Sequence, residues 1–103
     1  SKKVQIPSYR LKNTGIFPIY RILLEPQASR DLRRIRGADR DQLEQAVDRL
    51  TSNPRPYGAL KLGNDAFRIR VGQWRIIYGV DDAQRIVTIV RVLRRNERTY
   101  RNI

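Results

Sequence analysis

The chain has 103 residues, of which 40% are hydrophobic, and its 22 basic and 10 acidic residues give a formal net charge of +12. This length supports one domain with one modest core, and the excess of positive charge indicates an anionic partner, most simply nucleic acid. The sequence contains neither Cys nor His, which excludes a disulfide framework, a thiol nucleophile, and the commonest metal ligand and general base. We therefore expect no cofactor and no metal site.

Arginine supplies 18 of the 22 basic residues. Its planar guanidinium donates two hydrogen bonds to one phosphate, which favours nucleic acid as the partner. An anionic membrane would also attract this charge, but no segment combines a basic helical face with a bulky apolar one. No apolar run is long enough to span a bilayer, and the N-terminus lacks the apolar core of a signal peptide. These features predict a soluble, cytoplasmic protein without a membrane partner.

Residues 1–17 have no sustained periodicity and are interrupted by Pro7 and Gly15. They are interpreted as an N-terminal arm of unknown role, which can be a basic arm that touches nucleic acid, a short extra strand, or in part a non-native remnant. Residues 18–103 form a single predicted domain. It begins with a short strand at 19–24, whose residues are mostly apolar on both faces, as in the interior of a sheet.

Two amphipathic helices follow this strand. Pro26 suits the first turn of a helix, and Gly37 provides a natural end. The helix between them would bury Ala28, Leu32 and Ile35, which recur at helical spacing. Its outer face carries four arginines, interpreted either as solvated side chains or as part of a nucleic-acid surface: Arg30, Arg33, Arg34 and Arg36.

The second helix is expected to start after Asp39 as its N-cap and to end near Thr51. Its buried stripe would consist of the apolar residues Leu43, Ala46, Val47 and Leu50. Four of the ten acidic residues also belong to this helix: Asp39, Asp41, Glu44 and Asp48. This surface is therefore the one least suited to nucleic acid. The two helices together predict an αα-hairpin packed on one face of a sheet.

Residues 67–80 predict a β-hairpin. Apolar residues alternate with arginines up to Val71, then Gly72 and Gln73 follow, and the alternation resumes at Trp74, which is typical of a two-residue turn. This turn would pair Val71 with Trp74, Arg70 with Arg75 and Ile69 with Ile76. Because successive side chains alternate between faces, three arginines would share one face: Arg68, Arg70 and Arg75. Like charges across a hairpin destabilise it, so these residues either hold a polyanion or form a solvated edge.

Residues 86–93 form the longest β-branched run and are expected to be the central strand. The order strand, helix, helix and then three strands joined by short turns predicts an α+β fold, with an antiparallel sheet of about four strands and both helices on one face. The other face stays open and carries the arginines. Trp74 alternates in phase with Ile76 and Tyr78, so we expect it in the core rather than stacked on a base.

Five short motifs, taken in order, resemble the RelE branch of the RelE/ParE toxin superfamily over about residues 18–101. They are Ile-Tyr-Arg-Ile with a following Pro-x-Ala-x-x-Asp-Leu, then Asn-Pro-Arg-Pro-x-Gly, Lys-Leu with a nearby Gly, the Phe-Arg-Ile-Arg-Val-Gly-x-Trp-Arg-Ile-Ile-Tyr hairpin, and a basic stretch that closes on Tyr-Arg. The resemblance implies a RelE-like microbial RNase fold of order βααβββ and a toxin of a type II toxin–antitoxin pair. RelE members are mRNA interferases, that is, ribosome-dependent endoribonucleases that cleave mRNA in the A site and inhibit translation.

Two other functions stay open. A ParE-like member would inhibit DNA gyrase without nuclease activity, and a basic domain could bind nucleic acid without catalysis. The resemblance implies the ribosome and mRNA as partners, together with a RelB-like antitoxin and operator DNA reached only through the antitoxin complex. The positive charge predicts that an acidic or amphipathic antitoxin segment covers the basic surface, with a helix and a strand added at a sheet edge.

Metal-independent RNA cleavage proceeds when a 2′-hydroxyl attacks the neighbouring phosphate. It needs a proton acceptor, a proton source for the departing 5′-oxygen and cations around the phosphorane, and arginines supply the cations. Arginine stays protonated and cannot readily act as the base, so the acceptors in the basic tail are Tyr100 and Glu97. A tyrosine among guanidinium groups has its phenolate form favoured, because opposite charges stabilise the ionised state.

The resemblance assigns three catalytic roles. The tyrosine that matches Tyr100 is the general base, the arginine that matches Arg95 assists the leaving group, and the one that matches Arg75 stabilises the transition state. The tail lacks the Gly and His of the common pattern and has one extra residue, so the match at Arg95 is good to about one position. We expect five further residues to bind the RNA backbone: Arg68, Arg70, Lys61, Arg94 and Arg98. These groups should converge with Tyr100 on the open face of the sheet.

Overall fold

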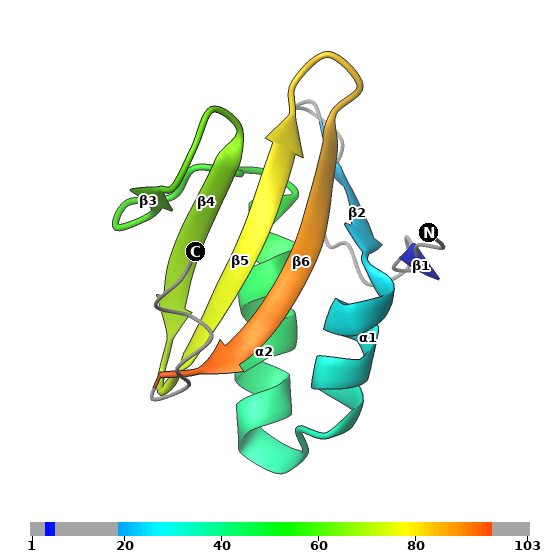
Figure 1. Cartoon of the computed structure of the whole chain (residues 1–103), viewed down its shortest axis with the longest axis vertical. Helices are drawn as coiled ribbons and strands as arrows, with labels where there is room; N and C mark the ends of the chain where they lie inside the picture. Colours follow the sequence, from blue (N-terminus) through cyan, green and yellow to red (C-terminus); the bar gives the residue numbers. More distant parts are fainter. Residues whose placement is uncertain (1–3, 6–18, 96–103) are drawn as a thin grey trace.

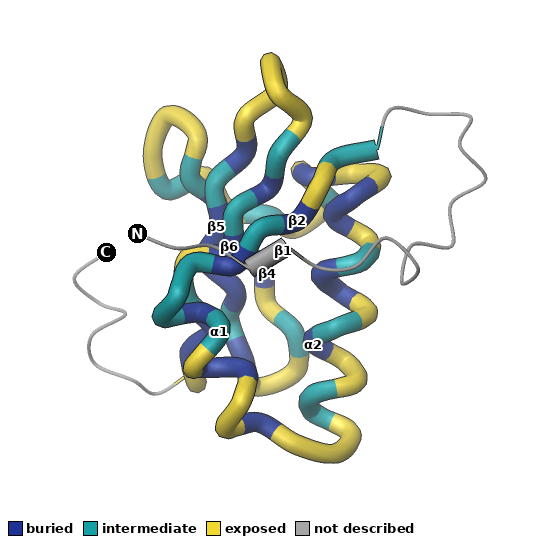
Figure 2. The backbone as a smooth tube through the Cα atoms, turned by 90° about the vertical axis from the view of Figure 1, so that its right-hand side faces the viewer, coloured by how far each residue is buried: buried dark blue, intermediate teal, exposed yellow. Residues whose placement is uncertain are grey.

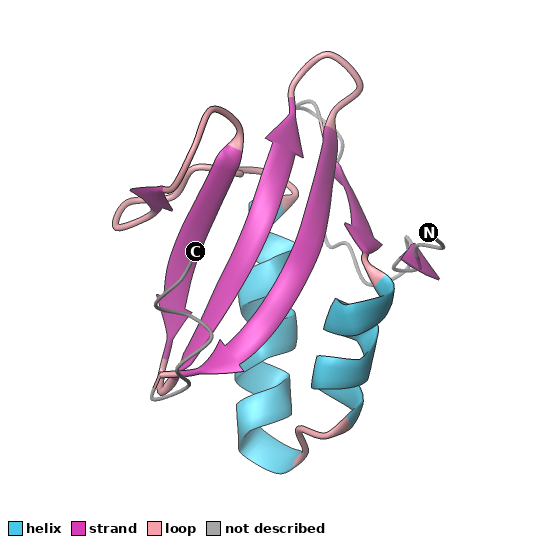
Figure 3. Cartoon of the chain, in the orientation of Figure 1, coloured by secondary structure: helices cyan, strands magenta, loops and turns pink. Residues whose placement is uncertain are grey.

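The structure, a computed structural model, describes residues 4–5 and 19–95. Two helices cover one face of a single β-sheet, and the other face carries no helix among the described residues (Figures 1 and 3). This arrangement confirms the predicted α+β class. The elements are β1 (Val4–Gln5), β2 (Arg21–Leu24), α1 (Pro26–Arg33), α2 (Gly37–Leu50), β3 (Leu60–Lys61), β4 (Ala66–Val71), β5 (Trp74–Asp81) and β6 (Ile86–Arg94).

The sheet is mixed rather than antiparallel throughout. Its six strands lie in the order β1-β2-β6-β5-β4-β3, and β2 pairs with β6 in parallel while the other neighbours are antiparallel. The parallel pair follows from the path of the chain in Figure 1. After β2, the two helices bring the chain back to the end of the sheet where β2 begins, so β4 runs in the same direction as β2. Each of the two following turns reverses the chain, so β6 again runs parallel to β2.

Two strands of the sheet are only two residues long. β1 lies within the predicted N-terminal arm and pairs with β2, so this part of the arm is a short extra strand. The other residues of segment 1–17 lie outside the described part of the chain. β3 comes from the segment that leads into the hairpin, and it covers only the first half of the outer edge of β4.

The boundary between the helices differs from the prediction. α1 ends at Arg33, and Gly37 is the first residue of α2 instead of the end of α1. Gly37 has φ +67, a left-handed conformation that favours glycine and turns the chain sharply between the helices. Asp39 consequently lies in the first turn of α2 and is not its N-cap, which is Arg36. Its carboxylate still stabilises the positive end of the helix dipole.

One apolar core fills the space between the helices and the sheet, as predicted. The expected stripes of both helices are buried, and they meet the inward-facing residues of β4, β5 and β6. In Figure 2 buried stretches alternate along the sheet strands and α2, whereas the turns between elements are exposed. Tyr78 lies at the centre with no exposed surface, and its hydroxyl donates to the carbonyl of Pro54 at 2.7 Å. Burial raises the pKa of Tyr78 to about 12.

Candidate nucleic-acid interface

The hairpin of β4 and β5 has the predicted register. Its turn is closed by Gly72 at φ +60, and the pairs nearest the turn are Val71 with Trp74, Arg70 with Arg75 and Ile69 with Ile76. Val71, Trp74, Ile69 and Ile76 face the helices and pack in or against the core. The arginines that alternate with them along the two strands therefore face the open side of the sheet. The prediction that Arg68, Arg70 and Arg75 share one face is therefore confirmed.

A β-bulge in β6 decides which residues of its second half face the open side. Ile77 pairs with Arg91 while the next residue, Tyr78, pairs with Ile89, so Val90 is an extra residue on β6. An extra residue reverses the alternation beyond it. As a result the side chain of Val92 packs in the core. The side chains at positions 93 and 95 project toward the open face.

Arg95 joins the three hairpin arginines on the open face. Its backbone N–H donates to the carbonyl of Gln73 in the hairpin turn at 2.9 Å, which holds the end of β6 against that turn. Burial lowers the pKa of Arg75, and the positive charges of Arg68, Arg70 and Arg95 lower it further. Burial and the neighbouring Arg70 likewise lower the pKa of Arg68. We name Arg68, Arg70, Arg75 and Arg95 the arginine cluster.

The arginine cluster stands on a partly apolar floor. Ile77 and Leu93 are 5% and 1% exposed, yet neither belongs to the core beneath the helices. Leu93 pairs with Arg75 across the sheet and therefore shares its face. A floor of low polarity strengthens the interaction of these cations with a bound anion. Arginines keep their positive charge at neutral pH despite the lowered pKa.

The structure does not bring every predicted residue to the arginine cluster. Arg94 pairs with Trp74, so it lies on the helix-facing side, and its Cζ is 5.1 Å from the centroid of the Trp74 ring. Lys61 pairs with Phe67, a core residue, and is likewise separated from the cluster by the register of the sheet. The remaining predicted residues lie outside the described part of the chain: Glu97, Arg98 and Tyr100.

Sequence reasoning missed the residue that fixes the end of β6. Asp31 of α1 is 6% exposed, and its carboxylate accepts the backbone N–H of Val92 at 2.9 Å and two N–H groups of Arg91 at 2.8 and 3.2 Å. The Arg91 guanidinium is thus turned toward α1. The signal was present, because Asp31 lies next to Leu32 on the buried stripe of α1, where an acidic residue requires a partner.

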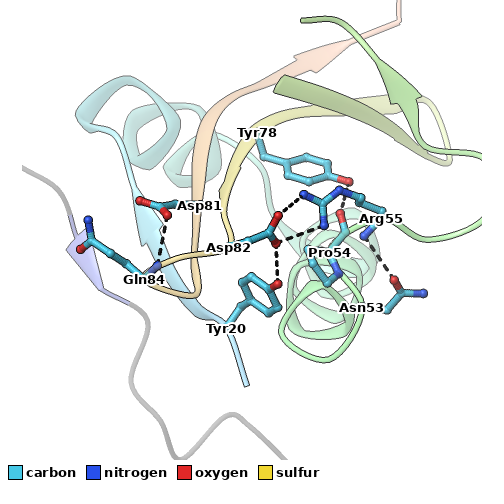
Figure 4. A network of polar contacts seen from close by, with 8 residues as sticks. All are labelled: Tyr20, Asn53, Pro54, Arg55, Tyr78, Asp81, Asp82 and Gln84. Carbon is cyan, nitrogen blue, oxygen red and sulfur yellow. Dashed lines mark hydrogen bonds and ion pairs between the residues drawn. The ribbon is translucent and has the colours of Figure 1, made fainter. Parts of the chain in front are cut away.

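A second polar network lies at the opposite end of the sheet. Asp82 in the turn between β5 and β6 accepts hydrogen bonds from the Tyr20 hydroxyl at 2.6 Å and from Arg55 at 2.7 and 3.2 Å (Figure 4). The hydrogen bonds from Arg55 and Tyr20 lower the pKa of Asp82. This network connects the start of β2 with the segment that follows α2. The network lies at the other end of the strands from the hairpin turn and is therefore separate from the arginine cluster. We assign it a structural role.

Comparison with known proteins identifies the family. The family model described as the ParE toxin of the type II toxin–antitoxin system parDE matches residues 22–99. No curated protein sequence matches the chain. Within the part of the chain that the structure describes, neither helix has the length and apolarity needed to cross a membrane.

Solved structures of RelE toxins share the fold. The archaeal RelE–RelB complex from Pyrococcus horikoshii OT3 matches with a TM-score of 0.67 and 23% identity, over 77% of this chain and 98% of that chain. The isolated E. coli RelE toxin gives a TM-score of 0.67 and 19% identity, over 82% and 93%. The toxin–antitoxin complex RelBE2 from Mycobacterium tuberculosis gives 0.55 and 25%, over 76% and 99%. The chain therefore belongs to the ParE toxin family of type II toxin–antitoxin systems, within the RelE/ParE superfamily, and it has the fold of RelE.

Proposed function

We propose that this toxin is a metal-independent endoribonuclease that cleaves mRNA in the ribosomal A site and so stops translation. The observation that carries the proposal is the arginine cluster, in which three hairpin arginines and Arg95 lie on the sheet face opposite the helices. Four adjacent cations repel one another, and a bound polyanion would offset this repulsion. The isolated E. coli RelE toxin shares the fold that carries this arrangement.

The proposed reaction is a transesterification of the RNA backbone. The 2′-oxygen of one nucleotide loses its proton and attacks the adjacent phosphorus, and the bond from phosphorus to the 5′-oxygen of the next nucleotide breaks. The departing 5′-oxygen gains a proton, so the products are a 2′,3′-cyclic phosphate and a 5′-hydroxyl. Negative charge develops on the non-bridging oxygens, where preorganised guanidinium groups stabilise the transition state most.

Three residues are proposed to carry the chemistry. Arg75, which lies directly across the hairpin from Arg70 on the partly apolar floor, stabilises the phosphorane. Arg95, fixed to the hairpin turn through its backbone, assists the departing oxygen. Tyr100 takes the proton of the 2′-hydroxyl, because positive neighbours favour a phenolate. Arg68 and Arg70 hold the flanking phosphates as planar donors rather than moving protons.

Inhibition of DNA gyrase is the second candidate, and the match to the ParE family model favours it. In that case the basic face would bind gyrase or its DNA without cleaving any bond. The two functions predict different products, since a nuclease shortens translated messages and a gyrase inhibitor leaves them intact while DNA supercoiling falls.

A translation reaction with primer-extension mapping tests the nuclease function. We expect the toxin to produce cuts within translated codons and to leave gyrase supercoiling unchanged. Arg75→Ala should reduce cleavage by about 10²- to 10³-fold, as expected for the loss of one transition-state cation. Tyr100→Phe should reduce cleavage by about 10²- to 10⁴-fold, as expected for the loss of a general base.

The matched control is Arg30→Ala, which removes an exposed arginine of α1 away from the open face. It should cleave at the wild-type rate. Intact messages together with inhibited supercoiling would reject the nuclease in favour of the gyrase function. Equal losses in Arg30→Ala and Arg75→Ala would show that total charge, and not the cluster, controls activity.

We further propose that the antitoxin covers the outer edge of β4. Among the described strands only β3 pairs with this edge, and only at Phe67 and Arg68, so the edge from Ile69 to the turn is open to another strand. A groove of about 790 Å³ follows this edge between β4, α2 and the segment 56–60. Arginines and exposed apolar side chains line it, which suits an acidic, amphipathic segment. RelB-like antitoxins occur in the complexes of the similar RelE toxins, and operator DNA would be reached only through such a complex.

A further inference from the structure

A hollow of about 340 Å³ lies on the helix side of the sheet end, beside the end of β6. It is lined by Trp74, by Val92 and Arg94 of β6, by Asp31 of α1, and by the connection between the helices and the start of α2, which contribute Arg34, Ile35, Arg36 and Asp39. We name it the Trp74 hollow. The volume is at the lower end of the range of small-ligand sites. None of the sequence predictions assigned it a role as a site.

Three guanidinium groups from two separate parts of the chain line the Trp74 hollow. Arg34 is the C-cap residue of α1, Arg36 is the N-cap residue of α2, and Arg94 ends β6. All three are exposed, and within the described residues none of them forms an ion pair with a carboxylate. Segments far apart in the sequence thus place their positive charge around one concave site.

The carboxylates of the hollow do not neutralise these arginines. Asp31 is already engaged by Arg91 and by the backbone of Val92. Of the two acidic residues that line the hollow, only Asp39 is then left, and it lies at the start of α2, where the helix dipole adds positive potential. The hollow therefore keeps an excess of positive charge.

Trp74 adds a second, independent feature. Its side chain is 9% exposed, and its Nε1–H is buried without a hydrogen-bond acceptor in the part of the chain that the structure describes. A buried donor normally has a partner. The Trp74 ring also carries the Arg94 guanidinium on its face. Guanidinium groups beside an aromatic wall are typical of sites that bind single-stranded nucleic acid.

The Trp74 hollow and the arginine cluster meet at the end of β6. Arg94 faces the hollow, and the next residue, Arg95, belongs to the cluster on the other side of the sheet. Consecutive Cα atoms are only about 3.8 Å apart. A single RNA strand that crosses this end of the sheet would therefore pass both sites.

We propose that the Trp74 hollow binds a phosphate of the RNA strand outside the cleavage site. Arg34 and Arg36 supply charged donors, and Arg94 guides the strand from the cluster over the sheet end. The choice of RNA as the strand rests on the proposed nuclease function. The hollow is a binding site only, and no bond is made or broken there.

The single tryptophan of the chain reports directly on this hollow. We would titrate the toxin with a single-stranded RNA that carries 2′-O-methyl groups throughout and cannot be cleaved, and follow Trp74 fluorescence alongside anisotropy of a labelled strand. Both signals should saturate at the same RNA concentration. The Arg34→Gln/Arg36→Gln variant should bind more weakly, and its slope of log affinity against log salt should fall by about 0.7, the value for one lost phosphate contact on a single strand.

The control variant Arg21→Gln/Arg30→Gln removes the same charge from two exposed positions outside the hollow. It should keep the wild-type salt slope and fluorescence change. Equal losses in both double variants, or RNA binding by anisotropy without a change at Trp74, would overturn the proposal. A fluorescence change with a Glu-rich peptide but not with RNA would also overturn it, in favour of a protein ligand.

The outcome is separable from that of the nuclease test. Selective loss of RNA binding in the hollow variant, combined with intact messages in translation reactions, would leave the hollow as an RNA site and reject the nuclease. Cleaved messages combined with equal salt slopes would retain the nuclease and reject the hollow.

Discussion

Asp31 illustrates how one side chain can replace a missing strand. β2 pairs with β6 only as far as Leu24 with Ile89, so no strand among the described residues borders the outer edge of the last part of β6. The Asp31 carboxylate accepts the Val92 N–H that this edge leaves unpaired, and it holds the Arg91 guanidinium with two hydrogen bonds. The end of β6, which carries Arg94 and Arg95, is thereby attached to α1.

We expect Asp31→Ala to lower the free energy of unfolding by about 2–4 kcal/mol, because it leaves a buried N–H and a partly buried guanidinium without their acceptor. Asp31→Asn keeps one acceptor oxygen and should cost about 1–2 kcal/mol. Urea unfolding followed by circular dichroism measures both. Asp41→Asn, an exposed position on α2, should change stability by less than about 0.5 kcal/mol. A loss no larger than that of Asp41→Asn would contradict the role assigned to Asp31.

At the scale of elements, most local features were predictable, apart from the helix boundary at Gly37, whereas the non-local ones were not. The hairpin register followed from a two-residue turn containing Gly72, because turn length fixes which residues pair. The bulge at Val90 has no such signal, since residues 86–93 are strand formers with or without an extra residue. The bulge decides which of the two consecutive arginines faces the open side, and the structure places Arg94 on the helix-facing side and Arg95 on the open face. The expectation that both lie on the open face was wrong because neighbouring strand residues alternate between faces. The parallel pairing of β2 with β6 joins segments about sixty residues apart, which no local pattern encodes.

The open edge of β4 leads to a prediction about the antitoxin. When the antitoxin binds, hydrogen exchange should slow at the amides of residues 69–72 and not at the opposite edge of the sheet. Leu60→Glu should weaken antitoxin binding at least about tenfold, because Leu60 is 46% exposed beside the groove and an acidic partner would be repelled.

Val90→Glu is the matched substitution, since Val90 is 39% exposed and does not line the groove. It should leave antitoxin affinity close to that of the wild type. Slowed exchange confined to another element, or equal weakening by the two substitutions, would exclude the β4 edge as the antitoxin site.

The charge of the whole molecule is distributed unevenly. Among the described residues, arginines gather on the open face and around the Trp74 hollow, whereas α2 carries acidic residues on its outer surface. Adjacent positive charges destabilise the folded state through repulsion, and at the same time they attract a polyanion. Stability and RNA binding should therefore respond in opposite directions to the removal of one cluster charge.

Arg70→Gln tests this opposition, because Arg70 lies directly across the hairpin from Arg75. We expect it to raise the free energy of unfolding by about 0.5 kcal/mol at low salt, with the gain shrinking as salt screens the repulsion. The same variant should bind uncleavable RNA more weakly. Urea unfolding at several salt concentrations, with Arg30→Gln as the comparison, measures the effect. A variant less stable than the wild type at low salt would refute the repulsion argument.

The extra residue in β6, Val90, has a consequence for how mutation can change the open face of the sheet. Because it sets the alternation of everything that follows, losing a single codon at position 90 would exchange the sides toward which Arg94 and Arg95 project. Overall charge and composition would hardly change, yet a different guanidinium would project from the open face. Length variation at this position, more than residue replacement, is thus a short mutational route between toxins that share this scaffold and differ in chemistry.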